Sequence, residues 1–268
     1  MHSEGSRLRV MGIINVTPDS FSDGGVHFDR NVAIDAALRM AEDGAAIIDV
    51  GGESTRPGAE PIAVDEELAR VIPVIEGIRA KSSVAISIDT RNAATARAAF
   101  AAGANMLNDV TALQHDAGML DAAVEANAPV ILMHMRGTPA TMQSHANYDD
   151  VIDDVLRELA PPVERARRAG LDEIFIDPGI GFAKTFDHNV EILVRCDELA
   201  RLAPFVIGAS RKKFIGHLTA REGAERVHGS LAAVAGAFLG GASIVRVHDV
   251  RETVDFLKVF GAIEAARR

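Results

Sequence analysis

Residues 45–61 read AAIIDVGGESTRPGAEP, and this stretch decides the fold. An apolar run of strand length carries Asp49 near its end and leads into a long connection rich in Gly, Pro, Ser and Thr. The same pattern, an apolar run closed by a polar residue and followed by a segment with helical spacing, recurs along the whole chain. Near-continuous apolar runs are typical of parallel strands covered on both faces. The pattern predicts an α/β fold, a single (β/α)8 TIM barrel.

The predicted strands are residues 10–14, 46–50, 84–88, 105–107, 130–133, 174–176, 205–207 and 243–247. The polar residues at or just beyond their ends are Asn15, Asp49 with Glu53, Asp89, Asn108, His134, Asp177, Ser210, and Arg246 with His248. In a closed barrel of parallel strands these ends converge on one rim, where the active sites of (β/α)8 enzymes lie. No linker-like segment interrupts the alternation, so residues 1–268 are predicted to form one domain.

Composition narrows the class of protein. The formal net charge of -10 disfavours nucleic acid and anionic membranes as partners, because both need broad basic surfaces. Cys196 is the single cysteine, and no signal-like or membrane-length apolar segment is present, which favours a soluble cytoplasmic enzyme. The sequence also lacks a dinucleotide fingerprint, a Walker-type loop, zinc-ligand spacing and a G-x-S-x-G elbow.

Two connections that follow predicted strands are unusually long, residues 15–28 and 51–61. Such connections in a compact barrel are usually lids or binding loops, and the alternative is irregular surface loops. Between the first two predicted strands, Val32, Ala36 and Met40 recur every four residues, as on one side of a helix.

The last predicted helix is apolar on two sides. One stripe holds Val250, Val254 and Leu257, and the other holds Phe256, Phe260 and Ile263. One stripe can face the sheet, and the second then most economically faces another copy of the chain, which predicts a homodimer through the C-terminal helices. The alternative is that neighbouring helices of the same chain cover it.

Four polar residues near strand ends suit a flat heterocycle. Carboxylates accept hydrogen bonds, a carboxamide donates and accepts, and an ammonium donates. A guanine-like or pterin-like edge matches this set, while a structural ion pair is the alternative for any single member. The four residues are Asp89, Asn108, Asp177 and Lys212.

A second group is cationic. Arginines bind phosphate oxygens bidentately and a nearby histidine can also donate, so Arg56, Arg246 and His248 predict a phosphate or pyrophosphate site. Asn15 could complete it by holding a bridging Mg2+ through its oxygen. Taken alone, His248 could equally be a packed, hydrogen-bonded histidine.

The segment Ser210-Arg211-Lys212 is predicted to begin a short helix, and the backbone N–H groups at its beginning favour a carboxylate. Phe182 could offer its face to an aromatic ring.

Eight stretches of this sequence resemble the dihydropteroate synthase family, in the family's order and over nearly the whole chain. They are MGIINVTPDSFSDGG from Met11, DVGGESTRPGA from Asp49, SIDT from Ser87, NDV from Asn108, MHMRGTPATMQ from Met133, DPGIGFAKT from Asp177, GASRKKFIG from Gly208 and RVHDV from Arg246. The resemblance implies a (β/α)8 pterin-binding barrel. It also implies a transferase that displaces pyrophosphate from 6-hydroxymethyl-7,8-dihydropterin pyrophosphate with p-aminobenzoate, giving 7,8-dihydropteroate by a cation-like substitution.

The resemblance also implies residue roles. Pterin binding falls to Asp89, Asn108, Val110, Met133, Asp177 and Lys212. Pyrophosphate binding falls to Asn15, Arg56, Arg246 and His248, with Asn15 on Mg2+. Binding of p-aminobenzoate falls to Phe21, Thr55, Pro57, Phe182, Ser210 and Lys212, and the catalytic residues are Lys212, Asp23 and Arg246. The alternatives are a methyltetrahydrofolate-binding methyltransferase barrel, which needs no pyrophosphate clamp, and a non-catalytic pterin-binding paralogue.

Overall fold

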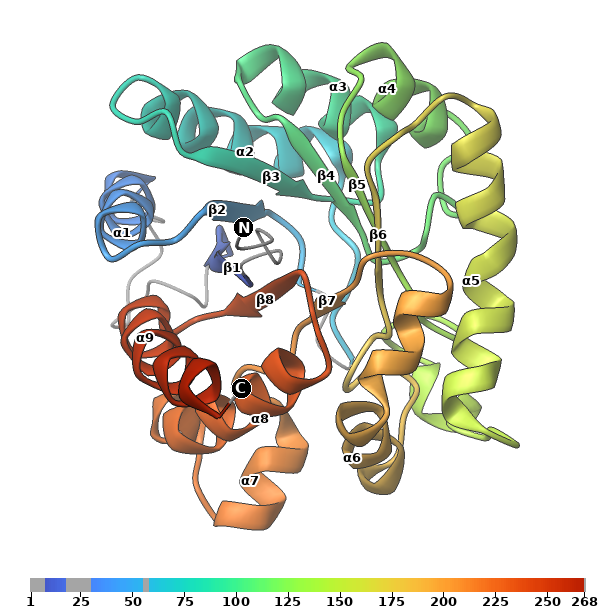
Figure 1. Cartoon of the computed structure of the whole chain (residues 1–268). Helices are drawn as coiled ribbons and strands as arrows, with labels where there is room; N and C mark the ends of the chain where they lie inside the picture. Colours follow the sequence, from blue (N-terminus) through green and yellow to red (C-terminus); the bar gives the residue numbers. More distant parts are fainter. Residues whose placement is uncertain (1–7, 18–29, 55–57, 268) are drawn as a thin grey trace, which may run out of the picture.

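The computed structural model describes residues 8–17, 30–54 and 58–267. In this part of the chain strands alternate with helices from end to end (Figure 1). The strands are β1 (Arg9–Asn15), β2 (Ile47–Gly51), β3 (Ala85–Asp89), β4 (Met106–Asp109), β5 (Val130–Met133), β6 (Ile174–Asp177), β7 (Val206–Ile207) and β8 (Ile244–Val247). The α-helices are α1 (Arg30–Glu42), α2 (Val64–Arg79), α3 (Ala93–Ala102), α4 (Met119–Glu125), α5 (Val151–Arg168), α6 (Phe186–Val194), α7 (Lys213–Thr219), α8 (Val227–Leu239) and α9 (Val250–Ala266). Short 3-10 helices are η2 (Met142–His145), η3 (Cys196–Arg201) and η4 (Gly223–Arg226).

The strands form one parallel sheet in the order β6-β5-β4-β3-β2-β1-β8-β7. A parallel bridge between Ile176 and Phe205 joins the two ends of this order, so the sheet curls into a nearly closed barrel with the helices outside (Figure 1). This confirms the predicted (β/α)8 barrel. The strand bounds agree with the sequence-based ones to within two residues, and the largest difference is that β4 continues to Asp109.

Two apolar layers hold the barrel together. The outer layer lies between the strands and the surrounding helices, as expected for strands buried on both faces. The inner layer fills the barrel, so the barrel is a packed core and not a pore. Its members, one from each strand other than β3, are Met11, Ile47, Met106, Ile131, Phe175, Val206 and Ile244.

The first helix buries a different side from the one that its four-residue repeat marks. Helix α1 buries Ala33, Ile34 and Ala37, whereas Val32 is 42% exposed. The reason is a groove on α2: a Cβ at Gly77 would lie 2.3 Å from the Ile34 side chain, so Ile34 occupies the space that this glycine leaves. The groove at Gly77 of α2 therefore decides which side of α1 is buried.

The last helix has one covered stripe and one partly open stripe. Val250 is buried, and Val254 and Leu257 pack against the outer core. On the second stripe Phe260 stacks on Phe256 and meets Phe238 of α8 edge to face, with ring centroids 5.2 and 5.4 Å apart. Ile263 stays 48% exposed. The neighbouring helix thus covers only part of the second stripe.

The two long connections lie partly outside the described residues. Within the described part of the second connection, Arg91 binds Glu53 through paired hydrogen bonds of 3.0 and 2.7 Å. This pair fixes the beginning of that connection just beyond β2. Whether the connections act as lids stays a prediction.

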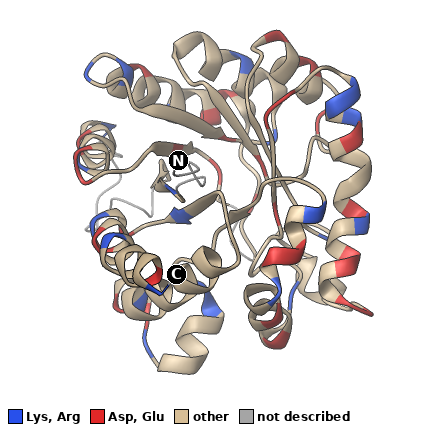
Figure 2. Cartoon of the chain, viewed as in Figure 1, with Lys and Arg blue, Asp and Glu red and all other residues tan. Residues whose placement is uncertain are grey.

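The charged residues are distributed over the outer helices. Along α5, basic and acidic positions follow one another without forming a basic face (Figure 2). Among the described residues, no helix combines the length and apolar character needed to cross a membrane.

Candidate active site

The carboxyl ends of the strands surround a cavity of about 1060 Å³. Its walls include the predicted residues Asn15, Asp89, Phe182, Ser210, Lys212, Arg246 and His248. A recess opens beside it, and all six residues predicted to bind the pterin line this recess: Asp89, Asn108, Val110, Met133, Asp177 and Lys212. Asp89, Phe182, Lys212 and Arg246 border both spaces. Side chains from β3, β4, β5, β6 and β8 therefore meet in one place, as the rim of a parallel barrel requires.

Arg246 is the centre of the polar network in the recess. Its Nε donates to Asp49 Oδ2 over 2.6 Å, and its Nη2 donates to Asp89 Oδ2 over 2.8 Å. Asn108 Nδ2 donates to the same Asp49 oxygen over 3.1 Å. The sequence placed Arg246 in a separate phosphate-binding group, but its guanidinium lies among the residues predicted to hold the heterocycle.

Asp49 belongs to this network, although the sequence predicted it only at the rim of the barrel and gave it no binding role. It is fully buried on β2, and its Oδ1 has no hydrogen-bond partner among the described residues. A carboxylate in this pairing can only accept, so the amide nitrogen of Asn108 must face Asp49 and its carbonyl oxygen must face the recess. The available signal was the position of this acidic residue near the end of an apolar run, which placed it at the rim.

Asp177 is oriented by the turn that follows β6. Its Oδ1 accepts the backbone N–H of Gly179 at 2.7 Å. Gly179 has φ +69°, and a Cβ there would lie 2.0 Å from the carbonyl oxygen of His134, so only glycine fits this turn. Burial raises the pKa of Asp177, against the lowering effect of Lys212 and Arg246.

Lys212 follows β7 and reaches back into the recess. Its Nζ lies 4.2 Å from the centre of the Phe182 ring, a cation–π distance. Burial lowers the pKa of Lys212 to about 8, assisted by the positive charge of Arg246 and opposed by Asp177 and Asp89. Burial raises the pKa of Asp89 to about 7, with Arg246 acting in the opposite direction. Both groups can therefore change charge near neutral pH.

Ser210 and His248 form a pair in the wall of the larger cavity. Ser210 Oγ accepts the backbone N–H of His248 at 3.1 Å and lies 3.1 Å from its Nδ1. Donation of the hydroxyl proton to Nδ1 would leave Nε2–H as the donor of the imidazole.

The neighbouring Arg211 binds Asp249 through its Nε over 3.0 Å, and α7 begins only at Lys213. The guanidinium of Arg211 is thus engaged in a structural ion pair.

Comparisons with known proteins place this site in a family. A family model described as pterin binding enzyme matches residues 11–248. The dihydropteroate synthase of Escherichia coli K12 is 46% identical, with 98% of this chain and 94% of that protein covered. Its counterpart from Bacillus subtilis is 45% identical, with 95% of this chain and 88% of that protein covered. A structure of Xanthomonas albilineans dihydropteroate synthase with 4-aminobenzoic acid matches with a TM-score of 0.90 and 49% identity, covering 97% of this chain and 94% of that one.

The chain belongs to the dihydropteroate synthase family of pterin-binding enzymes. A structure of the Yersinia pestis family member, a complex with a sulfonamide drug, has a TM-score of 0.92 and 44% identity, covering 97% of this chain and 95% of that one. Membership confirms that the chain is an enzyme, a transferase with dihydropteroate synthase activity. It supports that interpretation over the methyltransferase barrel and the non-catalytic paralogue.

Several residues with roles implied by the synthase family lie outside the described residues. These are Phe21, Asp23, Thr55, Arg56 and Pro57. Their predicted roles, binding of p-aminobenzoate and pyrophosphate and stabilisation of a cation, stay predictions.

Val110 and Met133 form an apolar floor beneath the recess of the synthase. Both are buried and pack in one cluster with Met142, Phe182 and Ala183. Phe182, predicted to face an aromatic ring, belongs to the same cluster and is 9% exposed. The cluster joins the part of the site predicted for the pterin to the part predicted for the arylamine.

Proposed function

We propose that this chain condenses 6-hydroxymethyl-7,8-dihydropterin pyrophosphate with p-aminobenzoate to give 7,8-dihydropteroate and pyrophosphate. The observation that carries the proposal is the recess lined by Asp89, Asn108 and Asp177, which opens beside a cavity lined by Asn15, His248 and Ser210. A flat ring in the recess would direct its reacting methylene toward the cavity, where the second substrate and the leaving group have room.

In this proposal the recess recognises the pterin by its donor edge. Asn108 presents a carbonyl oxygen because Asp49 accepts its N–H, and Asp177 has one oxygen fixed by Gly179. Acceptors of this kind match the amino group and ring N–H of a pterin. Lys212 supplies a donor on the other side, and Val110 and Met133 supply apolar contact with the ring.

The leaving pyrophosphate would be held at the mouth of the cavity. Bond breaking at the methylene leaves the electron pair on the pyrophosphate oxygen, so its negative charge grows in the transition state. His248 and Arg246 are placed to donate to that charge. Preorganised donors of this type contribute several kcal/mol to transition-state stabilisation, roughly 3 kcal/mol for one donor.

Mg2+ is part of this proposal, with Asn15 as the protein ligand. Mg2+ commonly keeps several waters and binds through one or two protein oxygens plus substrate phosphates. The described residues contain no group of three His, Cys, Asp or Glu side chains suited to a metal, and a single carboxamide beside a phosphate site fits this mode of binding. When bound, the ion would neutralise charge on the leaving group.

The arylamine would attack from the side of Phe182 and Ser210. The C–O bond to pyrophosphate breaks with its electron pair on the leaving oxygen, the amine nitrogen donates its lone pair to the resulting cation-like methylene, and the nitrogen then loses a proton to solvent. Phe182 offers a ring edge or face to the benzoate, and Lys212 lies 4.2 Å above that ring, where it can meet both substrates. Lys212 is therefore the residue that links the two halves of the reaction.

The test is incorporation of radiolabelled p-aminobenzoate into dihydropteroate by the purified chain with pterin pyrophosphate and Mg2+. Product must depend on all three additions, and a chelator must abolish it until Mg2+ is restored. Tight binding of pterin pyrophosphate without any product would contradict the proposal.

A homodimer through the C-terminal helices and a cytoplasmic location complete the proposal. On α9, Val259 is 64% and Ile263 is 48% exposed, and these residues lie one turn apart. Leu239 at the end of α8 is 63% exposed. Large apolar side chains exposed together support a second copy of the chain as their cover. The single, buried Cys196 supports a reducing compartment.

A further inference from the structure

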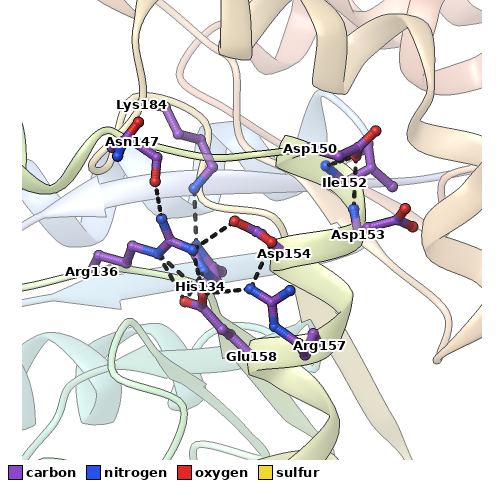
Figure 3. Close-up of polar contacts among 10 residues, drawn as sticks. All are labelled: His134, Arg136, Asn147, Asp150, Ile152, Asp153, Asp154, Arg157, Glu158 and Lys184. Atoms are coloured by element: carbon purple, nitrogen blue, oxygen red, sulfur yellow. Dashed lines mark hydrogen bonds and ion pairs between the residues drawn. The ribbon is translucent and has the colours of Figure 1, made fainter.

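A polar cluster that includes Lys184 lies in the wall of the active-site cavity, between the end of β5, α5 and the turn after β6. Figure 3 shows Lys184 reaching toward His134, and His134 lying against Glu158 of α5. Lys184 and His134 are 4% and 3% exposed. Lys184 Nζ lies 3.0 Å from His134 Nδ1 and 3.1 Å from the carbonyl oxygen of Phe182.

The protonation of His134 in this cluster follows from its partners. Its Nε2 lies 2.9 Å from Glu158 Oε2, and Arg136 Nε also donates to that carboxylate over 3.0 and 3.1 Å. The hydrogen bond with His134 lowers the pKa of Glu158 to about 2, so the carboxylate is charged and can only accept. His134 Nε2 must then carry the proton, which leaves Nδ1 as the acceptor for Lys184. Burial, with the nearby charge of Lys184, lowers the pKa of His134 to about 4, in keeping with a neutral ring.

The second hydrogen bond of Lys184 acts on the wall of the active site. Phe182 is the ring under Lys212, and its carbonyl oxygen is the group that Lys184 holds. The turn has other attachments, because Gly181 N–H donates to Asn189 Oδ1 and Phe182 N–H donates to Gly179 O. The Lys184 side chain ties this turn to His134, just beyond β5, so the position of Phe182 depends on the bond between Lys184 and His134.

We infer that Lys184 is a positioning residue for the arylamine, acting through the backbone of Phe182 and held in place by Nδ1 of His134. The inference rests on the proposed function, since it takes Phe182 as a wall of the p-aminobenzoate pocket. Lys184 needs no contact with substrate in this role. Asp89 and Asn108 lie on β3 and β4, and Asp177 is oriented by the Gly179 N–H, so pterin binding is expected to be nearly independent of Lys184.

Two substitutions of His134 separate positioning from stability. An asparagine places its amide near the position of Nδ1, so His134→Asn keeps an acceptor for Lys184 and loses the contact with Glu158. A glutamine reaches to the position of Nε2, so His134→Gln keeps the contact with Glu158 and loses the acceptor for Lys184. The KM for p-aminobenzoate is expected to rise about tenfold in His134→Gln, the order expected for one hydrogen bond to a charged group, and to stay within about twofold in His134→Asn. The KM for pterin pyrophosphate is expected to change by less than about twofold in both.

Lys184→Met is the direct test, because methionine fills a similar volume without the charge. The expected result is a rise of about tenfold in the KM for p-aminobenzoate with kcat changed less than about threefold. An unchanged KM for p-aminobenzoate, with only a lower melting temperature, would overturn the inference, as would equal changes in the two His134 variants. Absence of product from the unmodified chain would instead overturn the proposed function.

Discussion

Asp49 and Arg246 stand 197 positions apart in the sequence and share a hydrogen bond of 2.6 Å inside the barrel. The same Asp49 oxygen accepts from Asn108. One buried carboxylate therefore sets the orientation of two side chains that face the recess. Because its other oxygen has no partner among the described residues, Asp49 keeps its position through these two donors alone.

The first prediction concerns that carboxylate. Asp49→Asn introduces an N–H that can meet Arg246 or Asn108, so both lose a defined orientation. We expect pterin affinity, measured by calorimetry, to fall by about 10- to 100-fold, the order expected for losing hydrogen bonds to a charged group. Asp109→Asn is the matched control, since Asp109 is equally buried on β4 but binds Thr111 and the backbone of Leu113. Equal affinity losses in the two variants would contradict a specific role for Asp49.

The second prediction concerns Lys212. Burial disfavours its charge, so its removal is not expected to destabilise the fold, while turnover loses contacts with both substrates. Lys212→Ala should reduce kcat/KM by at least about 100-fold with a melting temperature equal to or above that of the unmodified chain. Lys258→Ala, an exposed lysine on α9, is the control. A rate near normal in Lys212→Ala would remove this residue from the mechanism.

How far the sequence predicts this site depends on where each residue lies relative to its strand. Asp89, Asn108 and Asp177 end apolar runs, so the barrel geometry alone brings them together. Asp49 also lies near the end of such a run, but its role depends on Arg246, which reaches it from the other end of the sequence. A strand-end pattern cannot show such a pairing.

The role of Lys184 was hidden for a different reason. It lies in a turn, and a lysine in a turn is usually exposed; its burial follows from the path of the chain around Gly179 and from α5, which supplies Glu158. The side that α1 buries was likewise set by a groove at Gly77 of α2. Local periodicity predicts a helix, but the shape of the neighbouring element decides which side of that helix is buried.

The third prediction is a narrow pH optimum. Asp89, with a pKa of about 7, carries its negative charge above that pH, and Lys212, with a pKa of about 8, carries its positive charge below that pH. kcat/KM for pterin pyrophosphate should therefore fall both below about pH 7 and above about pH 8 in the free enzyme. Asp89→Asn should lose the acid limb and keep the alkaline limb. A flat profile from about pH 6 to about pH 9 would show that neither group controls binding.

The fourth prediction separates two hydrogen-bond donors of the cavity, His248 and Arg246. His248 lies beside Ser210 and lines the cavity but not the recess, so His248→Ala should weaken pterin pyrophosphate binding about tenfold and leave the phosphate-free pterin unaffected. Arg246→Ala should weaken both ligands, because it also leaves two buried carboxylates uncompensated. Binding of each ligand to each variant can be measured by calorimetry. Selective loss of the phosphorylated ligand in Arg246→Ala would assign Arg246 to the pyrophosphate alone.

The fifth prediction concerns assembly. Val259 and Ile263 lie one turn apart on the exposed side of α9, beside the stacked Phe256 and Phe260. If a second copy covers this stripe, Ile263→Lys places a charge in an apolar interface and should shift the chain from dimer to monomer in sedimentation equilibrium. Val124→Lys on α4, a residue 38% exposed on another helix, provides the control and should leave the dimer intact. A monomeric unmodified chain, or a dimer that persists in Ile263→Lys, would place the interface elsewhere or exclude it.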